Sequence, residues 1–326
     1  MRLHKVLRVV MVTAALLAGA LAIGSGQPVV PIKPPLVTPL LPGGIEVVFQ
    51  VSLDKLAREL PEKLMVYRTY PDPEGMAQRT ALEHFLGKSA YFEVEQASGG
   101  VFCADLSRLW AKAPQPGDKV PTLGAQTLRA AVQEFLTAIR GIPEDKTTVS
   151  TSTDRMEFVD PRGTRQSLPL GYNVTYRRLL EGYEVVGPGG KIKVFLDLGG
   201  QVAGYLRVWR KLAPVGEKAL ISVYEAAERF KKDPLGTVLL ADVKRVVVSE
   251  LRLAYLARGM ADPQRFLQPI FVFTCTAYTQ AEEKGEQTQY VRYMEALSQP
   301  PESLWPEGGS YSPEDRPRTL PKPGED

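Results

Sequence analysis

The chain has 326 residues, of which 44% are hydrophobic and 24% are charged, and its formal net charge is +3. This composition is typical of a globular protein, since a disordered chain would have fewer apolar residues and more net charge. Without residues 1–22, which contain Arg2, Lys5 and Arg8 and no acidic residue, 37 basic residues balance 37 acidic ones. That balance argues against nucleic acid as the main partner, because binding to phosphate backbones needs an excess of Lys and Arg.

Residues 1–22 are predicted to direct export from the cytoplasm. Three basic residues precede Val9–Ile23, an uncharged stretch rich in Ala, Leu and Val. About 15 residues is the length of a signal-peptide hydrophobic region, and it is shorter than the ~20 residues that span a bilayer. Ala20-Leu21-Ala22 supplies a cleavage site. The alternative is an uncleaved membrane anchor through residues 6–23 with its basic end in the cytoplasm. Under both alternatives we expect the folded part to be extracytoplasmic.

Proline-rich segments flank the expected folded part. Residues 23–43 hold six prolines, which favours an extended stalk because proline has a fixed φ and no amide donor. Residues 299–326 hold seven prolines and are predicted to be disordered. Between these segments we expect an N-terminal α+β unit at 44–120 and C-terminal α+β units at 121–298, the latter containing a strand meander at 171–212.

Helix boundaries are marked at four places in the sequence. A short helix is expected after Ser52, a longer one from Asp72-Pro73-Glu74 to Gly87, a third over the helically spaced apolar residues Leu128–Ile139, and a fourth after the capping box of Ser222 and Glu225. Capping side chains, a proline at the first helical position and a terminal glycine are the usual signals of helix ends.

Alternating apolar and polar residues predict strands after the main helices. The expected strands are Tyr91–Glu95 with a turn at Gly99-Gly100 into Val101–Cys103, the meander Tyr172–Trp209 with a turn at Gly199-Gly200, then Leu251–Leu256 and Ile270–Ala277. Because helices followed by antiparallel strands recur along the chain, the predicted fold class is α+β, built from repeated helix-plus-antiparallel-sheet units.

Two stretches resemble a known family. They are the meander 174–210, VTYRRLLEGYEVVGPGGKIKVFLDLGGQVAGYLRVWR, and the later LQPIFVF at 267–273. With the flanking helices, mainly over residues 122–297, they resemble extracytoplasmic domains of the YycH/YycI type and the related PepSY-like modules. The resemblance implies a helix packed on a small antiparallel sheet. It also implies an anchored or secreted regulator that binds a sensor kinase, a protease or a wall component, without catalysis or cofactor.

Three features suggest chemistry, and for each a structural interpretation is favoured. The stretch Gly187–Lys191 lacks the first glycine and the final hydroxyl residue of a phosphate-binding P-loop, so it is predicted to be a hairpin turn. His84 lies in no protease-type context and is expected on a helix flank. Glu93 and Glu95 share one face of a strand and are expected to be solvated rather than to act as an acid–base pair. We therefore predict no catalytic, cofactor or metal site.

Cys103 and Cys275 are the only cysteines in the chain. Export would place them where disulfides form, so one alternative is a disulfide between the early unit and the last strand. The other alternative is two buried thiols, since Cys275 shares its strand face with apolar residues.

A candidate partner-binding face lies on the last strand of the meander. Its alternating residues are Val202, Gly204, Leu206 and Val208 on one side, and Tyr205, Arg207 and Trp209 on the other. We expect the aliphatic side to face a helix, which leaves the Tyr, Arg and Trp side chains on the opposite side, close to Phe195 of the neighbouring strand. These residue types are enriched at interface hot spots. The alternative is that a second domain covers this face.

The sequence thus favours a non-catalytic binding or regulatory protein of the cell envelope, whose partner is an envelope protein or peptide. Two alternatives stay open. A surface or filament structural subunit is compatible with the neutral charge of the mature chain, because neutral chains associate easily. A wall- or peptide-directed hydrolase would need carboxylates that converge in a cleft.

Overall fold

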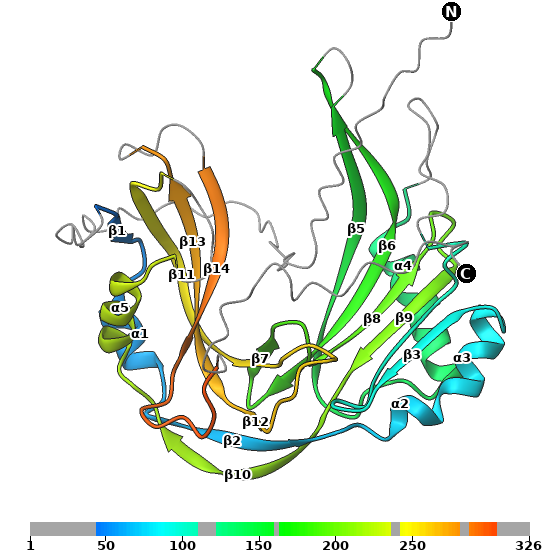
Figure 1. Cartoon of the computed structure of the whole chain (residues 1–326), viewed down its shortest axis with the longest axis horizontal. Helices are drawn as coiled ribbons and strands as arrows, with labels where there is room; N and C mark the ends of the chain where they lie inside the picture. Colours follow the sequence, from blue (N-terminus) through cyan, green and yellow to red (C-terminus); the bar gives the residue numbers. More distant parts are fainter. Residues whose placement is uncertain (1–43, 110–121, 160–162, 236–241, 281–286, 305–326) are drawn as a thin grey trace, which may run out of the picture. The chain divides into compact units, whose positions relative to one another are not determined.

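The computed structural model describes residues 44–109, 122–159, 163–235, 242–280 and 287–304 (Figure 1). The predicted export segment, the stalk and all but residues 299–304 of the predicted tail lie outside these ranges. Within them the chain is mixed α+β with more strand than helix, which confirms the α+β class. The structure does not confirm repeated PepSY-like units. None of the helices in these ranges is long and apolar enough to cross a membrane.

The described chain divides into two compact units, and neither follows the expected boundary at residue 120. Unit 1 consists of Arg68–Ala213 and Tyr255–Leu267, and unit 2 consists of the described residues within 44–67, 214–254 and 268–304. Three strands carry the chain from one unit to the other: β2 (Lys63–Tyr70), β10 (Lys211–Ala219) and β11 (Arg245–Leu256). Strand pairing between distant parts of the sequence therefore defines these units, which do not coincide with the expected division into 44–120 and 121–298.

Unit 1 is built on an antiparallel sheet with the strand order β5-β6-β8-β9-β4-β3. Its strands are β3 (Tyr91–Glu95), β4 (Gly100–Ala104), β5 (Thr147–Val159), β6 (Arg165–Leu180), β8 (Lys191–Leu196) and β9 (Val202–Val208). The short β7 (Tyr183–Val186) pairs with the end of β6, and the last residues of β11 pair with β7 in parallel. A separate three-stranded sheet has the order β10-β2-β12, where β12 is Phe266–Leu267.

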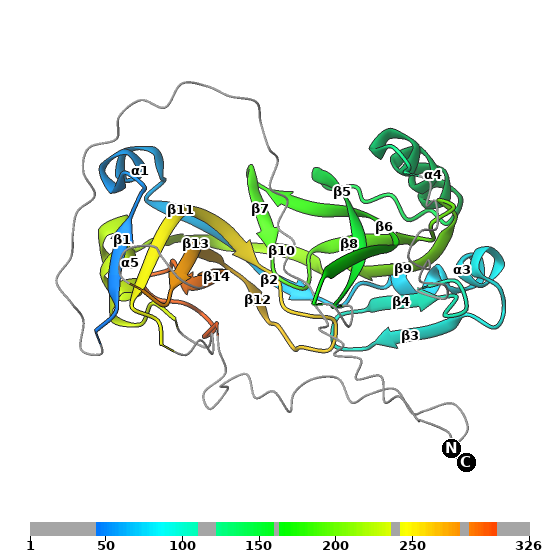
Figure 2. The ribbon, with the colours of Figure 1, turned by 90° about the horizontal axis from the view of Figure 1, so that it is seen from above.

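Three helices of unit 1 lie on one face of its sheet (Figures 1 and 2). They are α2 (Glu74–Ala77), α3 (Arg79–Leu86) and α4 (Ala125–Ala138). Apolar residues of α3 and α4, such as Leu82 and Val132, form one core cluster with sheet residues such as Val174, Ile192 and Val194, all of them fully buried. Among the described residues of unit 1, no helix packs on the opposite face of the sheet.

Unit 2 contains β1 (Glu46–Phe49), β13 (Pro269–Tyr278), β14 (Gln287–Glu295) and most of β11, with the order β14-β13-β11-β1. Its helices are α1 (Leu53–Glu59) and α5 (Val223–Lys232). Phe230 of α5 stacks on Phe273 at 4.5 Å between ring centroids and meets Phe49 edge-on at 6.0 Å. These aromatic contacts join α5 to both β1 and β13.

The local helix signals are confirmed. Ser52 and Ser222 accept hydrogen bonds from the backbone amides three residues later, at the starts of α1 and α5. The Asp72 carboxylate accepts a hydrogen bond from the Glu74 amide, but the helix expected after it is broken at Gln78 into α2 and α3. The predicted strands are all present, whereas β1, β2, β5, β10 and β14 have no predicted counterpart.

Candidate functional site

The predicted partner-binding residues of β9 are buried. Tyr205, Arg207 and Trp209 are 0%, 3% and 4% exposed. Tyr205 meets Phe135 of α4 at 5.7 Å between ring centroids and donates a hydrogen bond to Gln78. The side of β9 that carries Tyr, Arg and Trp is therefore the side that faces the helices. The expected orientation was wrong, because polar partners from the helical layer satisfy these side chains within unit 1.

Arg207 holds the start of α2 against the sheet. Its Nε donates to Asp72 at 2.8 Å and its Nη2 donates to Glu74 at 2.8 Å. Nη1 reaches the carbonyl of Gly141 at 3.4 Å. Because the side chains of Arg207 and Asp72 are only 3% and 2% exposed, each charge depends on the other for its stabilisation.

A second polar network, exposed at Asp145, continues from Trp209. Its Nε1 donates to Asp145 at 2.9 Å, and Arg178 pairs with the same carboxylate at 2.7 Å. The guanidinium of Arg178 lies 4.4 Å from the centroid of the Trp209 ring and donates to the carbonyl of Arg210. These contacts use the donors within the fold, so Trp209 is also unavailable to a partner.

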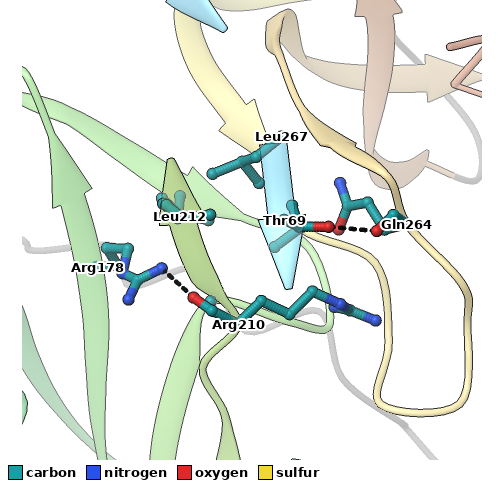
Figure 3. A pocket seen from close by; sticks show the side chains of 9 residues that line it. Thr69, Arg178, Arg210, Leu212, Gln264 and Leu267 are labelled. Atoms are coloured by element: carbon teal, nitrogen blue, oxygen red, sulfur yellow. Dashed lines mark hydrogen bonds between the residues drawn. The ribbon is translucent and has the colours of Figure 1, made fainter. Parts of the chain in front are cut away.

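A small cavity lies beside this network (Figure 3). Arg178, Arg210, Thr69, Gln264 and Leu267 are among the residues that line it. The space that the centre of a water molecule can occupy in it is about 10 Å³. This volume is at the lower limit for holding one water. The cavity is therefore too small for an organic ligand.

Phe195 lies on the other face of the sheet from Tyr205. In the β8–β9 register Phe195 is opposite Gly204, whereas Tyr205 is opposite Val194. Phe195 packs in a separate small cluster with Ala104, Leu109 and Ala203 and is 9% exposed. The four residues proposed as one binding face are thus divided between the two faces of the sheet, and all four are buried.

The face of the sheet opposite the helices carries a group of cationic and hydroxyl side chains that the sequence analysis did not assign to a site. The strand registers place Thr148, Arg177 and Lys191 side by side on β5, β6 and β8, and Ser150, Thr175 and Lys193 in the adjacent row. Side chains of directly opposed residues point to the same face of a sheet. We call these six residues the cationic patch.

Acidic partners are lacking at the centre of the cationic patch. Lys191 is only 4% exposed, yet in the described part of the chain neither Lys191 nor Arg177 forms an ion pair or donates a side-chain hydrogen bond. The Lys193 ammonium lies 4.6 Å from the centroid of the Phe195 ring. Its electrostatic environment includes the carboxylate of Asp154, which accepts a hydrogen bond from Asn173.

The electrostatics of Lys191 reflect this environment. Burial, with the neighbouring positive charges of Arg177 and Lys193, lowers the pKa of the Lys191 ammonium to about 8. Burial also lowers the pKa of Lys193, although the attraction of Asp154 acts in the opposite direction. A buried cation normally has an anionic partner. The patch is therefore electrostatically suited to an anion that the folded chain does not itself supply.

Apart from Lys191, the residues for which the sequence suggested chemistry lie outside the cationic patch. The segment Gly187–Gly190 is not a hairpin turn, because the two strands that it joins, β7 and β8, each pair with β6 and not with one another in the described sheet. His84 is exposed on α3, where its ring meets Phe85. Glu93 accepts a hydrogen bond from Tyr91, and Glu95 accepts one from the amide of Ala97.

Both cysteines are free and buried. Cys103 belongs to the core of unit 1, and Cys275 lies on β13 of unit 2 beside Tyr290. The predicted disulfide is therefore absent, and the second alternative, two buried thiols, is the one observed. Across the described ranges, no group of three His, Cys, Asp or Glu side chains is arranged to hold a metal ion.

Sequence reasoning missed Arg177, Lys191 and Lys193 because each looks like an ordinary polar position of an alternating strand. The sequence did contain an indication of the patch: in β8 the charged residues alternate with Ile and Val. The lysines therefore lie on one face of the strand, the same face on which Arg177 and Thr175 lie beside them. Recognising it requires the pairing of β6 with β8 and its register.

Comparisons with known proteins do not assign the chain to a family. No protein-family model matches it, and no curated protein does. One similar solved structure is the crystal structure of an uncharacterized protein from Eubacterium rectale, which is 8% identical in sequence and has a TM-score of 0.42. The match covers 77% of this chain and 87% of that one. A likeness of this degree supports no conclusion about function, and the resemblance to YycH/YycI and PepSY domains stays a prediction.

Proposed function

We propose that this chain is a non-catalytic extracytoplasmic binding protein of the cell envelope, and that unit 1 binds the anionic group of its ligand at the cationic patch. Export is inferred from residues 1–22, in which a basic start precedes an uncharged apolar stretch and a cleavage site. A regulatory role is consistent with the family resemblance of the meander.

The observation that carries this proposal is the unbalanced charge of the patch. Lys191 is 4% exposed and is repelled by two neighbouring cations, and no acidic side chain pairs with Lys191 or Arg177 in the described ranges. Like charges held together and desolvated destabilise a fold. An anionic ligand removes this destabilisation when it binds, because it supplies the missing charge and acceptor atoms.

Retention of the exported chain on immobilised polyanions tests the proposal. The probes are polyphosphate and polyglutamate resins, eluted with increasing salt, and the variant replaces Arg177, Lys191 and Lys193 together with Gln. Loss of several charged hydrogen bonds is expected to weaken binding at least about tenfold.

The matched control replaces Lys55, Lys88 and Lys218 with Gln. These lysines are exposed, so this variant loses the same charge without touching the patch. The control should keep its retention within about twofold, since distant surface charges contribute little. Equal weakening in both variants, or no retention of the parent chain on either resin, would refute the proposal. A thermal unfolding curve of each variant verifies that it is folded.

A further inference from the structure

The donors of the cationic patch come from three adjacent strands, and this arrangement distinguishes between the two common anionic groups of biological ligands. A carboxylate presents two oxygens in one plane, and a single guanidinium fork can satisfy both. A phosphate presents three or four oxygens in tetrahedral directions. It therefore needs donors from several sides, such as the guanidinium of Arg177 on β6 and the ammonium groups of Lys191 and Lys193 on β8.

The spacing of the patch matches one tetrahedral group. Adjacent strands are about 4.8 Å apart, and residues two apart on one strand are about 7 Å apart. Arg177, Lys191 and Lys193 thus start from neighbouring backbone positions, so their long side chains can reach one phosphate together. Half-buried hydroxyls of Ser150 and Thr175 border it in the second row, and within the described chain no other residue forms a side-chain hydrogen bond with them.

The charge of the patch also matches a dianion. Asp154 offsets part of the charge of Lys193, which leaves about two positive charges, on Arg177 and Lys191. A phosphate monoester carries a charge of about −1.5 to −2 at neutral pH, whereas a carboxylate carries about −1.

Given the proposed binding function, we propose that the anionic group bound at the cationic patch is a phosphate monoester in its dianionic form. A consequence of this assignment is that Lys191 takes up a proton when the dianion binds in mildly alkaline solution. The monoester belongs either to a soluble molecule or to a lipid headgroup, and both present the same oxygens.

The direction of the proton uptake follows from the groups around Lys191. Arg177 on β6 and Lys193 on β8 repel its charge, Asp154 acts mainly on Lys193, and the facing residue on β9 is the uncharged Val208. The free ammonium has a pKa of about 8, and an adjacent dianion raises it. Affinity should therefore fall as the pH rises above about 8. It should also fall below about pH 6, where the phosphate itself gains a proton.

The test compares phenyl phosphate with phthalate by titration calorimetry of the exported chain. Both probes are aromatic dianions, but only the first is tetrahedral. We expect phenyl phosphate to bind at least about tenfold more tightly, a difference typical of one well-placed charged hydrogen bond. The number of protons taken up on binding follows from the difference in binding enthalpy between two buffers of different ionisation enthalpy. At a pH equal to the Lys191 pKa of about 8, this number should be about half a proton.

Two substitutions at one position separate charge from proton uptake. Lys191→Gln should lose at least about tenfold in affinity for phenyl phosphate. Lys191→Arg should keep its preference for phenyl phosphate but lose the proton uptake, because a guanidinium does not deprotonate in this range. Phosphatidylcholine vesicles with and without phosphatidic acid identify the source of the monoester. If the chain binds vesicles that contain phosphatidic acid more tightly than it binds phenyl phosphate, the ligand is a lipid headgroup. If it binds phenyl phosphate more tightly, the ligand is a soluble monoester.

The outcomes distinguish this assignment from the proposed function. If phthalate binds as tightly as phenyl phosphate, or if the parent chain takes up no proton, the phosphate assignment is overturned while anion binding stands. If neither dianion binds but the polyglutamate resin still retains the chain through the patch, the ligand is an acidic peptide. If no anionic probe of either kind binds, the proposed function fails as well.

Discussion

At the scale of single residues, Lys191 lowers the stability of the protein that contains it. The residue is 4% exposed, and the charges of Arg177 and Lys193 repel its ammonium group. Desolvation disfavours the charged form of a buried amine, and like charges disfavour it further. A side chain that destabilises the fold in this way is typical of a binding site, where stability is commonly lower than the fold would allow.

Replacing this lysine with Met should stabilise the protein at neutral pH. The pKa falls from 10.5 to about 8 on folding, so below pH 8 the charged amine destabilises the folded state by up to about 3 kcal/mol. As the pH rises from about 8 to about 10.5 the unfolded chain binds more protons than the folded one, and the difference between Lys191→Met and the parent chain should shrink. Denaturant unfolding at several pH values measures this.

The exposed Lys218 on β10 provides the control. Lys218→Met should change the free energy of unfolding by no more than about 0.5 kcal/mol at any of these pH values. A Lys191→Met chain that is less stable than the parent at neutral pH would mean that the ammonium has a stabilising partner, and the cationic patch would lose its basis.

At the scale of secondary-structure elements, one ion pair fixes a helix to the sheet. Asp72, at the start of α2, is buried with Arg207 of β9. Removing one member of a buried pair leaves the other charge uncompensated, which costs about 3–5 kcal/mol. Arg207→Ala should therefore lower the free energy of unfolding by about that amount. Chemical denaturation monitored by circular dichroism measures the loss.

The pair of Arg229 and Glu225 on α5 is the matched comparison, because its side chains are 42% and 50% exposed. Arg229→Ala should cost about 0.5 kcal/mol, as is usual for exposed helix pairs. Similar losses from Arg207→Ala and Arg229→Ala would show that the Arg207 network contributes no more than a surface contact.

Local sequence signals predicted the helices because a cap needs only neighbouring residues. Ser222 and Glu225 form the start of α5 whatever the rest of the chain does. The side of β9 that faces the helices was not predictable in this way, since alternation shows that a strand has two faces but not which one is covered. Tyr205 and Arg207 looked like surface residues because their partners, Gln78 and Asp72, lie more than a hundred residues earlier.

At the scale of the whole molecule, the two units are not successive segments of the sequence. The α+β class was predictable from composition and periodicity, but the boundary near residue 120 was not observed. The cationic patch has the same origin: it exists only because β5, β6 and β8 pair in one register. Long-range pairing is the part of a fold that single-sequence patterns specify least.

The two cysteines report on both units at once. Burial raises the pKa of Cys103, with help from Glu83, to about 11, and burial raises that of Cys275 to about 12. Since the thiolate is the reactive form, neither should react with a disulfide reagent while the chain is folded. In denaturant without reductant, two thiols per chain should react with the reagent, because both cysteines are free.

In a Cys275→Ser chain one thiol should react under the same conditions, so that Cys103 alone reports on unit 1. If no thiol of the denatured parent chain reacts, a disulfide forms after all. Rapid labelling of the folded chain would instead mean that at least one unit opens readily.

The passage of the chain between units along β2, β10 and β11 has a consequence for the order in which the protein is built. Glu46 of β1 lies opposite Arg245 of β11, and unit 1 is completed by Tyr255–Leu267. A chain that emerges from a channel amino end first therefore holds β1 without its neighbour while about 200 residues follow. Contacts this distant in sequence form late, so neither unit is complete before β11 has emerged.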